Sequence, residues 1–233
     1  MKRYFLYINT ELRHMKIILA AATEMEMSYF RGACKESNII HIEYCITGVG
    51  AIATTFQLQK IILAVNPDIV IQIGLAGSFS TLYSIGNAVA VKNEIIAEMG
   101  VFEKEGYKDI FDLGLVNRDD FPYKNAQLIN EDEYILNITG LDCVSAVTVN
   151  EISTSKEKVD LYSNHYHALI ETMEGAALHY VCLQNNIRFI QIRGISNYIG
   201  ERDKSKWEIK KAMDAALAAY NNVITHLENN LSK

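Results

Sequence analysis

Short apolar runs along the chain alternate with segments of helical periodicity. The runs are rich in Ile, Val and Ala, and they predict strands at Lys16–Ala22, Ile39–Thr47, Asp68–Ile73, Asn87–Ala97, Cys143–Val149, Ala168–Thr172 and Arg188–Ile195. The intervening periodic segments predict helices at Ala51–Val65, Glu174–Asn185 and Trp207–Asn229. In the last of these, one apolar stripe is formed by Met213, Leu217, Tyr220, Ile224 and Leu227. A stripe of this kind is typical of a helix packed on a sheet. The alternation therefore predicts an α/β fold, a three-layer α/β/α sandwich with a central mixed sheet.

The chain shows no internal repeat and no linker rich in Pro, Ser or Gly, which predicts one domain over residues 15–233. Met15 opens the first predicted strand, so residues 1–14 are expected to be an N-terminal extension from an upstream start codon. The polar stretch Phe102–Asn130 is the least regular part, and we expect a surface excursion or a partial lid there.

The composition limits the classes of protein to which the chain can belong. With 233 residues, 49% hydrophobic content and two prolines, the chain can bury a substantial core. A net charge of −6 argues against nucleic acid as a partner. The longest apolar stretch, Ile61–Phe79, is interrupted by polar residues and is too polar to span a membrane. No CxxC pair occurs, so reduced thiols in a cytoplasmic protein are expected for Cys34, Cys45, Cys143 and Cys182.

The segment Arg193–Asp203 is the most informative part of the sequence. The apolar strand before it ends at Ser196 and Asn197, and ligands bind at the carboxyl ends of strands in open α/β sheets. An Asn there can read a donor and an acceptor on a planar base. Ile170–Ala177 has the same pattern, a short strand followed by an acidic residue where the next helix begins. Together the two segments predict a nucleoside site. The alternative for Asn197 is that its side chain only caps the following turn.

Acidic residues follow two of the predicted strands. Glu24 and Glu26 open a helix after the first strand, and Glu174 opens another. Acidic residues favour helix N-termini for electrostatic reasons alone, so a purely structural role is one reading of each. In the functional reading, Glu24 or Glu26 activates a water molecule. Met173 would then lie beneath a ribose whose hydroxyl protons the Glu174 carboxylate accepts.

Glycines predict turns after four strands, at Thr47–Gly50, Ile73–Ser78, Met173–Ala176 and Arg193–Ile195. The first two match neither a dinucleotide-binding fingerprint nor a P-loop. The first is weak evidence of a ligand site and fits a tight strand-to-helix turn somewhat better, whereas small residues in the second would let backbone N–H groups approach a ligand. His165 and His167 lack a nearby acidic or Cys partner, which favours a surface loop over a metal site.

These segments occur in an order that resembles the purine nucleoside phosphorylase/nucleosidase superfamily over Met15–Asn230. The resemblance rests on Met15–Met27, Gly74–Gly77, Ser145–Glu151, Met173-Glu174 and Arg193–Asn197. Within the superfamily the chain is similar to methylthioadenosine/S-adenosylhomocysteine nucleosidases, and more so to the futalosine hydrolases of the menaquinone pathway. The latter similarity rests on Thr148–Asn150, Met173–Ala176 and Ser196–Trp207.

The resemblance implies a role for each matching residue. Glu26 would deprotonate the attacking water, with Arg193 near it. Glu174 and Met173 would hold the sugar, and Asn197 would meet the base. The implied substrate-binding residues also include Val149, Asn150, Ser196, Ala76 and Gly77. Adenine-specific nucleosidases have Asp in place of Asn197, and Leu75 and Thr172 depart from their pattern too, which argues against methylthioadenosine as the substrate.

The implied reaction is hydrolysis of the N-glycosidic bond of a 6-oxopurine nucleoside, namely futalosine to hypoxanthine and dehypoxanthine futalosine. It needs no metal or cofactor, and the resemblance implies a homodimer or higher homo-oligomer. Alternatives are a methylthioadenosine/S-adenosylhomocysteine-type nucleosidase, a purine nucleoside phosphorylase and a non-catalytic nucleoside-binding module. The acidic segment Ala22–Glu26 would repel phosphate, which favours hydrolysis over phosphorolysis.

Overall fold

The computed structural model describes residues 14–35, 37–104 and 106–231. Residues 1–13 of the predicted N-terminal extension lie outside the described part. The strands are β1 (Met15–Ala21), β2 (Ile40–Ile46), β3 (Ile69–Ser78), β4 (Ala88–Ile96), β5 (Gly100–Glu103), β6 (Gly106–Asp109), β7 (Leu128–Ile129), β8 (Cys143–Thr148), β9 (Ile170–Thr172) and β10 (Arg188–Tyr198). The α-helices are α1 (Glu24–Arg31), α2 (Ala51–Val65), α3 (Glu133–Asn137), α4 (Lys156–Asp160), α5 (Gly175–Gln184) and α6 (Ile209–Leu231). A π-helical turn, Leu161–His165, follows α4, and a 3-10 turn, Lys204–Lys206, precedes α6.

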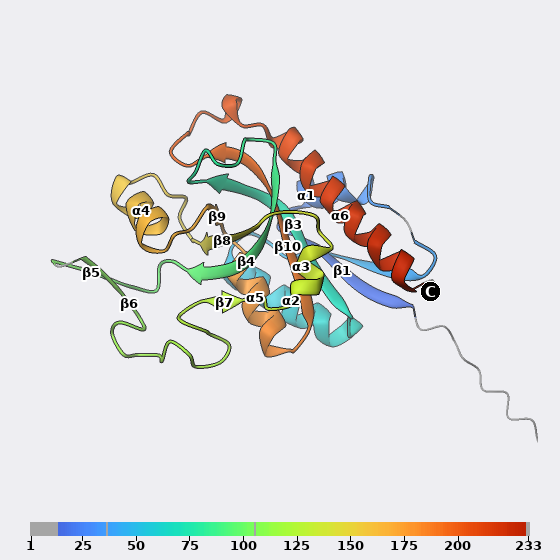
Figure 1. Cartoon of the computed structure of the whole chain (residues 1–233), viewed down its shortest axis with the longest axis horizontal. Coiled ribbons are helices and arrows are strands. Elements are labelled where there is room, and N and C mark those ends of the chain that lie inside the picture. Colours follow the sequence, from blue (N-terminus) through green and yellow to red (C-terminus); the bar gives the residue numbers. More distant parts are fainter. Residues whose placement is uncertain (1–13, 36, 105, 232–233) are drawn as a thin grey trace, which may run out of the picture.

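One mixed sheet forms the centre of the molecule (Figure 1). Its strand order is β10-β4-β8-β9-β3-β1-β2, with β7 beside β4. Strands β1, β3 and β10 are parallel, whereas β4 is antiparallel to β10. The first half of β3 pairs with β1, and its last two residues pair with β9, while β10 follows its other edge. The sheet therefore curls back on itself at the end where β3 meets β9.

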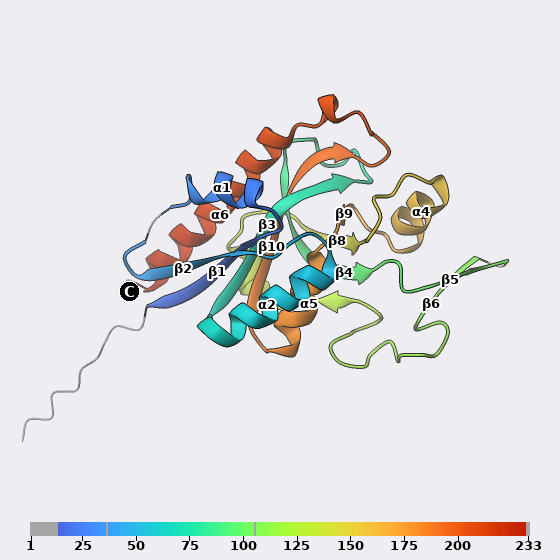
Figure 2. The ribbon, with the colours of Figure 1, turned by 180° about the vertical axis from the view of Figure 1, so that it is seen from behind.

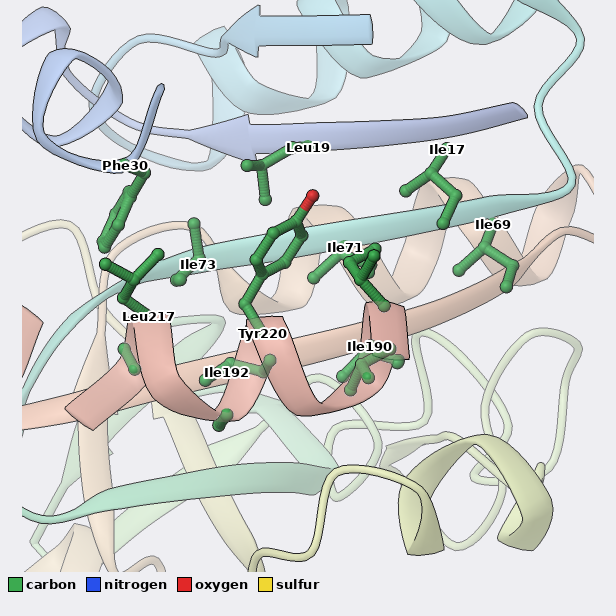
Figure 3. Close-up of a cluster of buried hydrophobic side chains, with 14 of the residues drawn as sticks. Ile17, Leu19, Phe30, Ile69, Ile71, Ile73, Ile190, Ile192, Leu217 and Tyr220 are labelled. Carbon is green, nitrogen blue, oxygen red and sulfur yellow. The ribbon is translucent and has the colours of Figure 1, made fainter. Parts of the chain in front are cut away.

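Helices cover both faces of the sheet, as predicted. Helices α1 and α6 pack on one face, and α2 and α5 pack on the other (Figures 1 and 2). On the first face, Leu217 and Tyr220 of α6 lie over isoleucines of β3 and β10 (Figure 3). All five residues of the predicted α6 stripe are buried. Each fully buried aliphatic or aromatic side chain stabilises the fold by about 1.5–3 kcal/mol.

Two of the predicted glycine turns are wrong, because β3 and β10 continue through Gly74, Gly77 and Gly194. Glycine occurs at these positions because neighbouring groups pack closely there, not because the chain reverses direction. A Cβ on Gly194 would lie 2.0 Å from the carbonyl oxygen of Ala212, so only glycine lets α6 approach β10 this closely. Gly74 has the same role inside the candidate site described below.

The stretch Phe102–Asn130 is a surface excursion, as predicted. It begins in the β5–β6 hairpin, continues as turns and loops, and returns to the sheet edge at β7 (Figure 1). In the described part of the chain, no helix is long and apolar enough to cross a membrane.

Candidate active site

A cavity of about 340 Å³ lies at the carboxyl ends of β1, β3, β9 and β10. Its position is that of ligand sites in α/β sheets, and its volume suits a small ligand. Eight of the ten predicted site residues line it: Glu26, Ala76, Gly77, Met173, Glu174, Arg193, Ser196 and Asn197. None of the described residues of Phe102–Asn130 lines it, so this part of the excursion does not form a lid over the cavity.

The two remaining predicted residues, Val149 and Asn150, are not among the lining residues. Val149 is buried in a separate apolar cluster with Tyr162. Asn150 is exposed, and its backbone N–H donates to Glu98 (2.8 Å). Because β8 ends at Thr148, the chain turns away before it returns, and Ile152 is the residue of this loop that reaches the cavity.

Glu26 has one oxygen in a helix cap and the other near the cavity. Its Oε2 accepts hydrogen bonds from the backbone N–H (3.1 Å) and hydroxyl (2.8 Å) of Thr23, which completes a capping box at the start of α1. Its Oε1 lies toward Gly74, where an added Cβ would be 3.1 Å away. Glu24 is exposed and accepts from Ser28 instead. Of the two candidate acids, only Glu26 lines the cavity.

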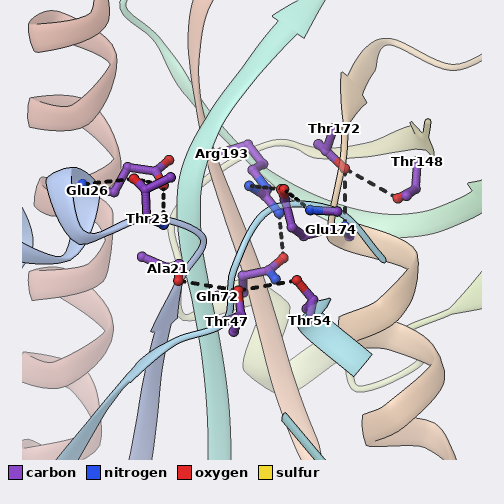
Figure 4. A network of polar contacts seen from close by, with 12 residues as sticks. Ala21, Thr23, Glu26, Thr47, Thr54, Gln72, Thr148, Thr172, Glu174 and Arg193 are labelled. Atoms are coloured by element: carbon purple, nitrogen blue, oxygen red, sulfur yellow. Dashed lines mark hydrogen bonds and ion pairs between the residues drawn. The ribbon is translucent and has the colours of Figure 1, made fainter. Parts of the chain in front are cut away.

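Arg193 is the charged centre of the site (Figure 4). Its side chain is only 2% exposed, its Nη1 lies 3.7 Å from Oε2 of Glu174, and its Nη2 donates to Oε1 of Gln72. A Cβ on Gly74 would lie 2.7 Å from Nη1. Glycine at this position therefore lets the guanidinium and the Glu26 carboxylate approach the same point of β3. A water molecule there can accept from Arg193 and donate to Glu26.

Glu174 stands where β9 passes into α5. Its Oε1 accepts from the backbone N–H of Gly50 (3.0 Å). Gly48 and Gly50 have φ values of 80° and 89°, so the predicted tight strand-to-helix turn is confirmed, and glycine is required in it. The turn also fixes the carboxylate. Since each carboxylate oxygen has two lone pairs, Glu174 retains acceptor capacity on its cavity side for a vicinal pair of hydroxyls.

Asn197 lies in β10 with its carboxamide held from two sides. Its Oδ1 accepts from the Ser196 hydroxyl (2.8 Å), and its Nδ2 donates to the carbonyl oxygen of Tyr198 (3.0 Å). A carboxamide has two N–H donors and two acceptor lone pairs, so one of each remains. Asn197 therefore makes a local hydrogen bond, as the capping alternative expects, and still offers a donor and an acceptor to a ligand.

Comparison with known proteins assigns the chain to a family. The model of the phosphorylase superfamily matches residues 22–227, which include every residue that lines the cavity. The chain belongs to this superfamily. A futalosine hydrolase of Thermus thermophilus is 28% identical over 215 residues, which cover 87% of this chain and 92% of the relative. A futalosine hydrolase of Streptomyces coelicolor is 26% identical, covering 70% of this chain and 67% of the relative.

Solved structures of superfamily members share the fold. A 5′-methylthioadenosine/S-adenosylhomocysteine nucleosidase of Colwellia psychrerythraea in complex with adenine superposes with a TM-score of 0.77 at 18% identity, covering 92% of this chain and 96% of that one. A futalosine hydrolase of Helicobacter pylori superposes with a TM-score of 0.76 at 15% identity, covering 91% and 98%.

Behind the cavity lies a buried polar layer that the sequence did not reveal. The Thr148 hydroxyl donates to Glu94 (2.7 Å) and accepts from the N–H of Ala176 (2.7 Å) at the start of α5. Burial raises the pKa of Glu94 to about 7 and lowers the pKa of the neighbouring His179 to about 4. The layer holds the first turn of α5 and so positions Glu174. In the sequence, this layer was indicated only by Glu94, an acidic residue within an apolar strand.

Glu171 is a second residue that the sequence did not identify. It lies in β9, lines the cavity and is only 6% exposed. The backbone N–H of Ser153 donates to its Oε1 (3.1 Å). The signal was again an acidic residue within a short β-prone run.

The two histidines of the metal alternative, His165 and His167, are exposed and line a separate cavity of about 320 Å³. Within the described ranges, no group of three or more His, Cys, Asp or Glu could hold a metal ion.

Proposed function

We propose that the protein hydrolyses the N-glycosidic bond of a 6-oxopurine nucleoside, and that this substrate is futalosine. The observation that carries the proposal is the approach of Glu26 and Arg193 to the same point of β3 at Gly74, beside the Glu174 carboxylate. This arrangement can hold and deprotonate a water molecule next to a sugar. The curated relatives named futalosine hydrolase support the choice of substrate. The products would be hypoxanthine and dehypoxanthine futalosine.

Each polar group of the cavity has a role in such a reaction. Glu26 takes the proton of the attacking water, and Arg193 orients that water. Glu174 binds the ribose hydroxyls, with Met173 against the sugar. The transition state has oxocarbenium character, and electron density moves into the imidazole ring of the leaving purine. The leaving purine takes up a proton at N7 from a solvent water, and Asn197 can accept from that N7–H and donate to O6. General acid or base groups of this kind contribute roughly 10²–10⁴-fold.

The geometry disfavours the two enzymatic alternatives. A phosphorylase needs an anion site, but the cavity has three carboxylates, Glu26, Glu171 and Glu174, and its guanidinium already faces Glu174. Negative charge there repels phosphate. A nucleosidase for adenine nucleosides would be served better by Asp than by Asn197, because a carboxylate accepts from both the 6-amino group and N7–H, whereas an amide offers an acceptor to only one of them. A non-catalytic binder has no use for a water-activating carboxylate such as Glu26.

The proposed setting follows from the substrate. Futalosine hydrolysis would place the protein in menaquinone biosynthesis. We propose the cytoplasm as its location, supported by the four cysteines, which form no disulfide in the part of the chain that the structure describes. We propose that residues 15–233 form a single domain.

We also propose a homo-oligomer, with a dimer as the smallest form. Apolar side chains continue from the rim of the cavity at Met25 and Val49 onto the outer face of α2, where Ile52 is 87% and Phe56 is 64% exposed. A second subunit packed on this face would bury these residues and close the 5′ end of the nucleoside site.

The proposed reaction is tested by incubating the pure protein with futalosine, inosine and methylthioadenosine, with and without phosphate. Futalosine is expected to release hypoxanthine at the same rate in both conditions, because water is the nucleophile. Base release can be followed by chromatography. Turnover that requires phosphate and yields a sugar 1-phosphate would contradict hydrolysis.

Glu26→Gln is expected to lower turnover at least about a hundredfold while the protein still folds. An amide cannot take a proton from water, but glutamine still completes a capping box. Glu24→Gln is the matched control, since Glu24 is exposed and outside the cavity. Equal losses in the two variants would show that the assignment of Glu26 is wrong.

Asn197→Asp is expected to shift the ratio of kcat/KM values toward 6-aminopurine nucleosides. A carboxylate opposes the lone pairs of O6 but accepts from an amino group, and such a mismatch costs roughly 1–3 kcal/mol, or about 5- to 150-fold. The measurement is kcat/KM for inosine and adenosine, or for futalosine and its 6-amino analogue, in both proteins. An unchanged ratio would leave Asn197 with only its local bond to Tyr198.

Light scattering of the purified protein is expected to give the mass of a dimer or larger assembly, and Phe56→Glu is expected to reduce that mass. A charge on the α2 face cannot be buried without a partner, so it would oppose packing of a second subunit. Lys210→Glu, at an exposed lysine of α6 on the opposite face of the sheet, is the control for added negative charge. A monomeric wild-type protein would contradict the proposal.

A further inference from the structure

A buried row of polar groups lies behind the cavity, where β4, β7, β10 and α5 meet. It runs from the carbonyl oxygen of Leu128 through His179 and Gln191 to Glu94. Nδ1 of His179 lies 3.0 Å from the Leu128 oxygen, and the Gln191 amide acts as a hydrogen-bonding group on both His179 and Glu94. The side chains of the row are fully buried, so their polar atoms depend on one another for hydrogen bonds.

Glu94 and Gln191 meet at Gly175, the first residue of α5. A Cβ on Gly175 would overlap both Oε2 of Glu94 and the Gln191 amide, so glycine lets the two groups lie against the same point of the helix. Oε1 of Glu94 already accepts from Thr148 (2.7 Å). Oε2 of Glu94, Nε2 of His179 and both polar atoms of Gln191 have no other hydrogen-bond partner in the described part of the chain.

The row can satisfy these atoms only if it holds one proton more than an ionised glutamate and a neutral histidine supply. A carbonyl oxygen only accepts, so the Leu128 oxygen needs a proton on Nδ1 of His179. In a neutral imidazole Nε2 is then an acceptor. It takes the NH₂ end of the Gln191 amide, whose oxygen faces Glu94 and needs a donor there. If the amide is turned the other way, its oxygen needs a second proton on His179. Without the extra proton, two acceptors oppose each other in either orientation.

The surroundings favour Glu94 as the carrier of this proton. Burial raises the pKa of Glu94 to about 7, whereas burial lowers the pKa of His179 to about 4. The charged groups that act on Glu94 are Arg193 of β10, which favours its ionised form, and Glu174 at the start of α5, which disfavours it. The neighbouring strands β7 and β8 contribute a leucine and a threonine, which do not titrate.

We propose that Glu94 is a positioning residue that holds a proton in the active protein, with Oε2 donating to the Gln191 amide and Oε1 accepting from Thr148. This assignment rests on the proposed function and adds to it a residue outside the cavity lining. The neutral acid keeps the Thr148 hydroxyl in place, and this hydroxyl accepts from the N–H of Ala176 in the first turn of α5. Because that turn begins beside Glu174, the proton on Glu94 supports the carboxylate that would bind the ribose.

An ionised Glu94 would disturb the charge balance of the site. Nη1 of Arg193 lies 3.7 Å from Oε2 of Glu174, which is longer than a hydrogen bond. Nε of Arg193 is buried and has no hydrogen-bond partner among the described residues. A second buried carboxylate behind the guanidinium would therefore compete with Glu174 for it. Since Arg193 orients the attacking water in the proposed reaction, its displacement would slow turnover.

The proton is tested by infrared spectroscopy of wild type, Glu94→Gln and Thr148→Val. At about pH 6, where exposed carboxyls are ionised, wild type is expected to show the C=O stretch of a protonated carboxyl that Glu94→Gln lacks. This band is expected to disappear as the pH is raised through about 7. Thr148→Val removes the hydroxyl that donates to Oε1, so it is expected to move the same band to higher frequency. That movement assigns the band to Glu94 even if Glu94→Gln does not fold. Glu133→Gln, at an exposed acid, is the control and is expected to leave the band unchanged.

The positioning role is tested by the pH dependence of kcat/KM for futalosine. Wild type is expected to lose activity above about pH 7, by up to about tenfold for each pH unit, because loss of the proton leaves a second carboxylate beside Arg193. Glu94→Gln is expected to lack this loss, since its amide donates to Gln191 and accepts from Thr148 but does not ionise. Glu133→Gln is again the control and is expected to keep the wild-type profile.

The outcomes separate this assignment from the proposed function. If wild type shows no band that Glu94→Gln lacks and that Thr148→Val moves, Glu94 carries no proton, and the proposed hydrolysis stands. If the band is present but wild type and Glu94→Gln have the same pH profile, the positioning role is overturned. A wild type that gains activity above about pH 7, with a Glu94→Gln variant impaired at every pH, would show that Glu94 is instead an ionised partner of Arg193. If no nucleoside releases its base, the proposed function itself fails, whereas the infrared band still decides whether Glu94 holds the proton.

Discussion

The buried guanidinium of Arg193 is the constraint on which the site depends. A positive charge that is almost fully removed from water must be matched by negative or polar partners, since an unpaired buried charge is strongly destabilising. Glu174 and Gln72 supply these partners. The groups around these partners are constrained in turn. Glu174 must be held at the start of α5, which the Gly50 N–H and the buried Thr148 layer accomplish, and β3 must carry a glycine where Nη1 passes.

The cavity has two parts, one for the sugar and the reacting water and one for the base. The charged groups, Glu26, Glu174 and Arg193, gather toward the ends of β1 and β3 and the start of α5, where a sugar and a water molecule would react. Asn197, which would meet the base, lies at the end of β10 and pairs with Gly77 of β3, which in turn pairs with Glu171 of β9. The sheet positions both sets because its curl brings β9 beside the end of β3. Without that closure, Glu171 and Glu174 would not face the strands that carry Gly77 and Arg193.

The local pattern of the sequence predicted most of the elements, because buried strands and amphipathic helices have distinct periods. Helix α2 has the predicted bounds, and every predicted strand is present within a few residues, although β3 and β10 run further than predicted. Failures occurred where tertiary contact decides the outcome. Gly74 and Gly194 resemble turn residues in sequence, but they lie within strands because Arg193 and α6 approach them closely.

Only some residues of the candidate site could be predicted from the sequence, for a similar reason. Residues at strand ends, such as Glu26 and Asn197, could be found because the position alone points to a ligand. Glu171 could not, since its exposure to the cavity depends on which strand pairs with Gly77. Val149 and Ile152 show the same limit, because only the path of the chain after β8 decides which of them reaches the cavity.

The most direct test of this account is a crystal structure of the protein with hypoxanthine bound. The account places the base in the cavity at the end of β10, with its N7 and O6 edge at the Asn197 carboxamide. It also places a water molecule between Glu26 and Arg193. A base found elsewhere, for example in the separate cavity beside His165 and His167, would contradict the central claim that this end of the sheet is a nucleoside site.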